Sequence, residues 1–433
     1  MRRTTLSALI ASPVAAVSLA GLALSSTAMA DSPDLGPESA AVVDFKAPNG
    51  GVDTSTRYVV TTAAERAEHF GATTALGTVK DASGQKLVIS RTTADQIARM
   101  NHGEAGERGP GFRSFATRAE AEAFVQNDRT AQTVGAALDL PPVDNQDTVN
   151  PWLDEVQEES IRKTITDLST TWPNRYYASS HGKAAAAYVH DAWTKVAGDR
   201  EDVTVAYDES CGSDCGNQSN VTMTVKGTEN PEEIVVIGAH FDSVSNAGQG
   251  DDMDAPGADD NASATATVTE VARVALESGW KPKRTVVFAA YAAEEVGLVG
   301  SNAMAQSFAS EGKDVVGVLN LDMTNYDGGQ ADMAVMEDNV STELTAFNKE
   351  VFNTYLEPKG MTLGSYQCGY GCSDHSSWTS AGYPASMMAE SELSPYIHTP
   401  DDTLENAGGT ADHSVKFAQF GLAFLGEMAK TGA

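Results

Sequence analysis

Three apolar runs decide the fold of this chain: Ile234-Val-Val-Ile-Gly238, Thr285-Val-Val-Phe-Ala-Ala-Tyr291 and Val315-Val-Gly-Val-Leu-Asn-Leu321. Continuous apolar runs of this length are typical of strands that are buried on both faces. The two stretches between them, 263–277 and 301–310, have helical spacing. Strands that alternate with helices in this way predict a largely parallel sheet covered by helices.

The flanking segments extend the same pattern. Helical spacing is present at 156–168 and 183–196, and short strand-like stretches follow at 203–207 and 221–225. We therefore predict an α/β domain with three layers, helix, sheet and helix, around a mixed, mainly parallel central sheet.

The amino end has the pattern of a secretory signal. Arg2 and Arg3 precede an apolar stretch, 6–24, which leads to the small-residue site Ala28-Met29-Ala30. A membrane anchor reads similarly, but serine and proline interrupt the apolar stretch and no stop-transfer pattern follows. We predict a signal peptide at 1–30 and an extracellular, secreted protein.

The next segment, 31–143, is rich in Ala, Thr, Arg and Glu and has only short helical signals, at 94–100 and 118–124. It contains none of the chemistry described below and ends at a Pro141-Pro142 break. We interpret it as a propeptide, followed by a catalytic domain at 144–433. A permanent small domain is the alternative interpretation.

Composition limits the partners of the chain. Its 433 residues include 60 acidic and 29 basic ones, which gives a net charge of -31. Such a charge repels nucleic acids and anionic membranes, so we expect neither as a partner. We expect a secreted monomer.

The four cysteines form two pairs with identical spacing, Cys211 with Cys215 and Cys368 with Cys372. In an oxidising compartment this favours two short-loop disulfides. A structural zinc held by four cysteines is the alternative, although it usually has tighter spacing.

Side chains able to bind metal follow each of the three apolar runs. His240 and Asp242 follow the first, Glu294 and Glu295 follow the second, and Asp322 follows the third. Each signal alone is weak, because single histidines and acidic turns have ordinary structural roles. Together they point to cations, because carboxylates gathered at buried strand ends repel one another unless cations neutralise them.

Two further segments complete a ligand set: the loop Asp259-Asp260-Asn261 and the later His398. Two imidazoles and three carboxylates are what two zinc ions with one shared carboxylate require. The predicted ligands are His240, Asp259, Glu295, Asp322 and His398, which leaves Glu294 free to act as a base.

From Pro151 to about Gly426 the chain resembles the secreted bacterial leucyl aminopeptidases, a family of co-catalytic two-zinc enzymes. The matching stretches are VIGAHFDSV (236–244), APGADDNASAT (255–265), AYAAEEVGLVGSN (290–302), VLNLDMTNYD (318–327), CGYGCSDHSSWT (368–379) and YIHTPDDTL (396–404).

The resemblance implies a role for each ligand. Asp259 would bridge the two zinc ions, one completed by His240 and Asp322 and the other by Glu295 and His398. Asp242 would hold the His240 imidazole from behind. The peptide bond between Asp259 and Asp260 would be cis.

The resemblance also implies a mechanism. Zinc-bound water would attack the first peptide bond of a peptide with a free amino end, with Glu294 as general base and the Tyr370 hydroxyl holding the oxyanion. The Cys368–Cys372 loop would form one wall of an apolar pocket for leucine and other large apolar residues. The predicted pocket residues are Met323, Met387 and Ile397.

Other functions remain open from the sequence. A glutaminyl cyclase of the same fold would hold one zinc per chain, and a binding ectodomain of this fold would hold none. A carboxypeptidase of related fold would release residues from the other end of the peptide.

Overall fold

The structure is a computed structural model that describes residues 47–68, 70–80, 84, 86–100 and 111–432. The predicted signal peptide, 1–30, and the first part of the predicted propeptide lie outside the described residues. The described residues belong to one compact unit, Asp44–Ala433. Among them, no helix combines the length and the apolar character that crossing a bilayer requires.

An eight-stranded sheet forms the centre of the chain, with the order β11-β10-β12-β9-β7-β8-β6-β5. Its members are β5 (Val203–Asp208), β6 (Asn220–Val225), β7 (Asn230–His240), β8 (Arg284–Tyr291), β9 (Asp314–Leu321), β10 (Met333–Met336), β11 (Leu363–Tyr366) and β12 (Ala385–Ala389). The four central strands, β12, β9, β7 and β8, are parallel, whereas β6, β5 and β10 pair antiparallel with their inner neighbours. This confirms the predicted mixed, mainly parallel sheet.

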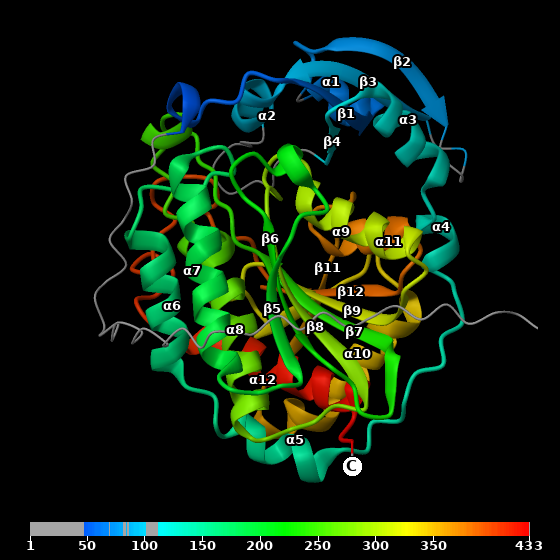
Figure 1. Cartoon of the computed structure of the whole chain (residues 1–433), viewed down its shortest axis with the longest axis vertical. Coiled ribbons are helices and arrows are strands. Elements are labelled where there is room, and N and C mark those ends of the chain that lie inside the picture. The colour runs from blue at the N-terminus through cyan, green and yellow to red at the C-terminus, as the bar shows by residue number, and fades with distance from the viewer. Residues whose placement is uncertain (1–46, 69, 81–83, 85, 101–110, 433) are drawn as a thin grey trace, which may run out of the picture. The chain divides into compact units, whose positions relative to one another are not determined.

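Helices cover both faces of this sheet (Figure 1). They are α5 (Gln146–Leu153), α6 (Glu158–Thr170), α7 (Ser180–Ala197), α8 (Ala264–Glu277), α9 (Val299–Ser310), α10 (Thr342–Tyr355), α11 (His375–Ala381) and α12 (Asp412–Ala429). Helices α8 and α12 pack on β7 on one face, and α11 packs with α9 on the other.

The alternation of side chains along the central strands explains both layers. In β7, Val235 and Ile237 belong to the apolar cluster that includes α8 and α12. Val236, between them, belongs to a second cluster with Phe308 of α9 and Trp378 of α11. Because successive side chains of a strand point to opposite faces, a continuous apolar run needs a helix layer on each side.

A second, smaller sheet precedes the eight-stranded sheet in the sequence. It is antiparallel, with the order β2-β3-β1-β4, and packs with short helices around its own apolar cluster. Its elements are β1 (Thr56–Thr62), α1 (Ala63–Glu68), β2 (Thr74–Lys80), β3 (Lys86–Thr93), α2 (Ala94–Met100), β4 (Arg113–Phe115), α3 (Arg118–Asn127) and α4 (Thr130–Thr133).

The sequence predicted helices in this region, which α2 and α3 confirm, but it did not predict the four strands. Strand β2 is exposed along nearly its whole length, so it lacks the alternating apolar pattern by which a strand is recognised. We call the described residues between 47 and 133 the N-terminal sheet unit.

Candidate metal centre

The carboxyl ends of the three central strands bring the predicted metal-binding side chains together. His240 is the last residue of β7, Glu294 and Glu295 follow β8 after a two-residue link, and Asp322 follows β9 directly. Parallel neighbours end at the same edge of a sheet, and this edge is where ligands bind in such folds. His398 reaches the same place from the loop after β12.

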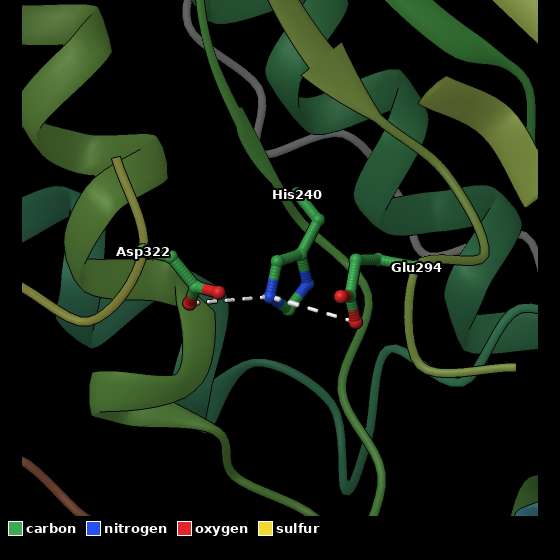
Figure 2. A group of neighbouring side chains, drawn as sticks. All are labelled: His240, Glu294 and Asp322. Carbon is green, nitrogen blue, oxygen red and sulfur yellow. Dashed lines mark ion pairs between the residues drawn. The ribbon is translucent and has the colours of Figure 1, made fainter. Parts of the chain in front are cut away.

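One group of side chains lies around the Nε2 atom of the His240 imidazole. Its Nε2 atom lies 3.6 Å from Oδ1 of Asp322 and 4.0 Å from Oε2 of Glu294. Figure 2 shows the imidazole between these two carboxylates. Oδ1 of Asp322 is buried and accepts no hydrogen bond from the described residues, as expected of an atom that binds a cation.

A second group centres on Asp260, whose two carboxylate oxygens face two different histidines. Oδ1 lies 3.2 Å from Nε2 of His240, and Oδ2 lies 3.2 Å from Nε2 of His398. The same Nε2 of His398 lies 3.0 Å from Oε2 of Glu295. One carboxylate thus joins the two imidazoles, which is the arrangement of a shared ligand.

This geometry corrects the sequence-based choice of Asp259 as the shared ligand. Oδ1 of Asp259 instead accepts hydrogen bonds from the backbone amides of Asn325, at 3.0 Å, and Tyr326, at 3.2 Å. The cis peptide bond predicted in this loop is present, but it joins Asp260 to Asn261 rather than Asp259 to Asp260. Two adjacent aspartates offer the same chemistry, and only the turn of the backbone decides which one faces the histidines.

Asp242 lies behind His240, as predicted. Its Oδ1 is 3.4 Å from Nδ1 of the imidazole. Its two oxygens also accept hydrogen bonds from the backbone amides of Glu294, at 3.0 Å, and Glu295, at 3.2 Å. One carboxylate therefore orients the imidazole and the two glutamates that follow β8.

The residues fit a divalent cation by their chemistry. Asp260, Glu294, Glu295 and Asp322 are buried and lie around the imidazoles of His240 and His398. Burial raises the pKa of Glu295 to about 7 and that of Glu294 well above its usual value, although nearby histidines oppose the shift. An excess of buried carboxylates is costly unless cations neutralise it, and a set of imidazole and carboxylate ligands suits zinc.

Sequence reasoning missed Arg175, which connects two of the loops of this centre. Its side chain is fully buried and donates to the backbone oxygens of Phe241, at 2.7 Å, Gly257, at 2.8 Å, and Leu168, at 3.1 Å. Phe241 follows His240, and Gly257 precedes the Asp260 turn. An arginine is not a metal ligand, so no motif drew attention to it, and its role depends on contacts between distant segments.

Asp402 was also missed. It lies four residues after His398, is buried, and accepts hydrogen bonds from the backbone amides of Asp259, at 2.9 Å, and Asp260, at 3.0 Å. Its carboxylate therefore fixes the turn that presents Asp260 to the histidines. In the sequence it looks like an ordinary acidic residue of a surface loop.

A cavity opens over the metal centre, and its walls include several residues predicted from sequence. Tyr370, Met323 and Ile397 line it, and Leu298 and Phe112 join them. Met387 does not. It is buried in a separate apolar cluster with Met336, against which the Cys368–Cys372 loop packs. Met387 is thus one layer behind the wall, because β12 directs its side chain into the core.

The cysteines pair as predicted. Cys211 bonds to Cys215 and Cys368 to Cys372, and the structure contains no free cysteine among the residues it describes. Cys372 is part of the cavity wall beside Tyr370, so the second disulfide borders the metal centre.

A helix-covered parallel sheet with histidines and carboxylates gathered under a cavity at its strand ends defines the class of metallohydrolases. Within that class, residues 220–422 match the model of peptidase family M28.

Individual relatives agree with the family match. Leucine aminopeptidase 1 of Arthroderma otae is 34% identical over 354 residues, which cover 75% of this chain and 91% of the relative. LapB of Legionella pneumophila has the same fold, with a TM-score of 0.72 and 24% identity over 87% of this chain and all of its own. BSAP, a zinc aminopeptidase of Bacillus subtilis, has a TM-score of 0.51 and 18% identity over 64% of this chain and 97% of its own.

The chain therefore belongs to peptidase family M28. It is a zinc-dependent aminopeptidase that acts on peptides, which confirms the predicted resemblance to the zinc aminopeptidase family.

Proposed function

We propose that the chain is a secreted aminopeptidase that uses two zinc ions to remove leucine and other large apolar residues from the amino ends of peptides. The observation that carries the proposal is Asp260, whose two carboxylate oxygens each face a different imidazole. A carboxylate shared in this way is the ligand that a pair of metal ions needs.

The ligands divide into two groups around that shared carboxylate. His240 and Asp322 would complete one zinc, and His398 and Glu295 the other. When bound, the two ions would lower the pKa of a water molecule and polarise the carbonyl group of the substrate. The remaining steps depend on side chains of this chain.

Glu294 is the proposed general base. Its carboxylate faces His240 but belongs to neither ligand pair, so it can receive a proton from the attacking water. As the water oxygen bonds to the carbonyl carbon and the carbon–nitrogen bond breaks, Glu294 passes that proton to the leaving nitrogen.

Tyr370 is the proposed donor to the oxyanion, because its side chain borders the cavity beside the glutamates. The first residue of the substrate would contact the apolar part of the wall, formed by Met323, Ile397 and Leu298. An apolar wall of this kind supports a preference for leucine, which the name of the Arthroderma otae relative also supports.

We further propose that the N-terminal sheet unit belongs to a propeptide, as the sequence analysis predicted for 31–143. Phe112 of this unit borders the catalytic cavity, where a substrate would have to enter. The predicted boundary also has structural support. The backbone amides of Asp144 and Asn145 donate to the buried Glu427 carboxylate, at 3.1 and 2.8 Å. A cut after Val143 would leave the new amino group beside that carboxylate.

Hydrolysis of leucine p-nitroanilide by the secreted protein tests the proposal. A chelator should abolish activity, and zinc added back in counted equivalents should restore it fully near two equivalents per chain. Recovery complete at one equivalent, together with cyclisation of amino-terminal glutamine, would replace the proposal with a glutaminyl cyclase. A protein that binds zinc but releases residues only from the carboxyl end would be a carboxypeptidase.

A further inference from the structure

One segment of the N-terminal sheet unit reaches into the catalytic cavity. We call Gly111–Phe115 the inserted segment; it includes strand β4. Phe112 is 7% exposed, and its ring forms part of the cavity wall together with Glu294 and Leu298. On its other side the ring packs edge-on against Phe70 of the same unit, with 5.2 Å between the ring centroids.

The backbone of the inserted segment runs along the turn that follows Glu294. Ser114 donates from its amide to the Gly297 oxygen, at 3.4 Å, and from its hydroxyl to the Val296 oxygen, at 2.5 Å. Gly297 has a φ of +106°, and a Cβ atom there would lie 2.6 Å from the Ser114 amide. A larger residue at 297 would therefore displace the segment, so the turn is shaped to receive a peptide backbone.

The cavity wall formed by the Cys368–Cys372 loop also lies close to the inserted segment. A Cβ atom at Gly111 would collide with the ring of Tyr370. The backbone at this point therefore lies directly on the proposed oxyanion donor. The inserted segment is thus held between the Glu294 turn and the Cys368–Cys372 loop.

Arg113 occupies a site built from polar groups of the catalytic domain. Its guanidinium donates to the Gly371 oxygen, at 3.2 Å, and to the hydroxyl of Ser376. Burial lowers its pKa to about 10, which the nearby carboxylates of Asp128, Glu294 and Asp374 oppose. Two of these three carboxylates, Glu294 and Asp374, belong to the catalytic domain and would remain if the N-terminal sheet unit left.

We propose that the surface that holds Phe112 and Arg113 is, in the processed enzyme, the subsite for the part of the peptide that follows the bond to be cut. This rests on the proposed function, because Glu294 must deliver its proton to the leaving nitrogen. The leaving residues therefore lie beside the Glu294 turn, where Phe112 and Arg113 lie in the uncut chain.

The inserted segment thus resembles a bound leaving peptide, and it defines the substrates that the uncovered subsite takes. An aromatic or large apolar side chain fills the position of Phe112, and a cationic side chain fills the position of Arg113. Peptides of the type Leu-Phe-Arg therefore bind better than peptides with small or acidic residues at these two places.

A substrate series on the secreted enzyme tests the subsite. The enzyme is taken as it accumulates in the medium, its amino end is sequenced, and kcat/KM is measured for the amides of Leu-Phe-Arg, Leu-Phe-Glu and Leu-Ala-Ala. Leu-Phe-Arg amide should exceed each of the others by about tenfold or more, the usual contribution of one filled side-chain pocket.

The outcomes separate this inference from the proposed function. Equal kcat/KM values for the three amides, with leucine p-nitroanilide still cleaved, overturn the subsite alone. Failure to cleave any of these substrates, with zinc bound and the N-terminal sheet unit removed, overturns the aminopeptidase function. Full activity in a chain that still carries the N-terminal sheet unit overturns the subsite, because the inserted segment would then not occupy the path of the leaving peptide.

Variants of the uncut chain give a second measurement. Phe112→Ala combined with Arg113→Ala should raise the hydrolysis of leucine p-nitroanilide by the uncut chain about tenfold, because both contacts with the subsite are lost. Arg118→Ala is the matched control, since Arg118 is an exposed arginine of the same unit that pairs with Glu122. An equal rise in both variants would indicate general loosening of the unit and would count against the inserted segment.

Discussion

The two sheets of this protein differ in the charged side chains that they bury. The eight-stranded sheet buries several carboxylates and the His240 imidazole at the ends of β7, β8 and β9, whereas the N-terminal sheet buries two arginines, Arg57 and Arg113, among apolar and hydroxyl side chains. Parallel strands end at one edge and concentrate their loops there, but antiparallel neighbours end at opposite edges. The difference teaches that strand direction, more than composition, decides where a catalytic centre can form.

The variant with the largest expected effect is Glu294→Gln, which removes one of these buried carboxylates. Loss of the proposed base should lower kcat by roughly 10²–10⁴-fold while zinc content stays unchanged, because the neutral amide cannot accept the proton of the water. Glu120→Gln, at the exposed capping position of α3 in the other sheet unit, is the control and should leave kcat as it was. Equal kcat in the two variants would remove Glu294 from the mechanism.

The next test concerns the two adjacent aspartates of the metal loop. Asp260→Asn should abolish binding of the second zinc equivalent, because the shared ligand of both ions is weakened. Asp259→Asn should retain both ions, since Asp259 contacts backbone amides rather than the imidazoles. Zinc titration of the metal-free variants distinguishes them. Loss of the second zinc equivalent in Asp259→Asn but not in Asp260→Asn would identify Asp259 as the shared ligand.

The metal centre and the N-terminal sheet unit each have a buried arginine, and replacing each one in turn extends the comparison of the two regions. Arg175→Met should weaken zinc binding roughly 10–100-fold, as expected for a residue that positions ligands from behind, and Arg175→Lys should recover part of the loss. Arg57→Met is the control, because Arg57 is buried in the N-terminal sheet unit and donates to the backbone oxygen of Asp214, which is not part of a metal-binding loop.

Arg57→Met should lower the unfolding temperature without changing zinc affinity. Competition with a chelator measures the affinity, and thermal unfolding measures the stability. Equal zinc affinities for the two methionine variants would show that Arg175 has only a general structural role.

The smallest expected effects come from the two disulfides. Closing so short a loop contributes about 2 kcal/mol to the free energy of unfolding, so replacing either pair with serine should cost a similar amount. Only the Cys368→Ser/Cys372→Ser variant should also lower kcat/KM, by about tenfold, because its loop carries Tyr370 into the cavity wall. Equal kcat/KM values for the two serine variants would show that the Cys368–Cys372 loop does not contribute to substrate binding.

The sequence was sufficient for the catalytic fold because its signals are local. The apolar runs of β7, β8 and β9 identify buried strands by themselves, and the residue that follows each run identifies the chemistry. Two strands of the N-terminal sheet, β2 and β4, were missed for the opposite reason. Strand β2 is mostly exposed, and β4 has only three residues, so neither has a pattern that distinguishes it from a loop.

The sequence by itself determined the sheet, the metal-binding residue types and the cysteine pairs. Only the tertiary structure decided between Asp259 and Asp260, moved Met387 behind the cavity wall and revealed Arg175, Asp402 and the inserted segment. The physical reason is that residue type and spacing follow from the chain alone. The direction of a side chain in a turn, and the contacts between segments that are distant in the sequence, are fixed only when the chain packs.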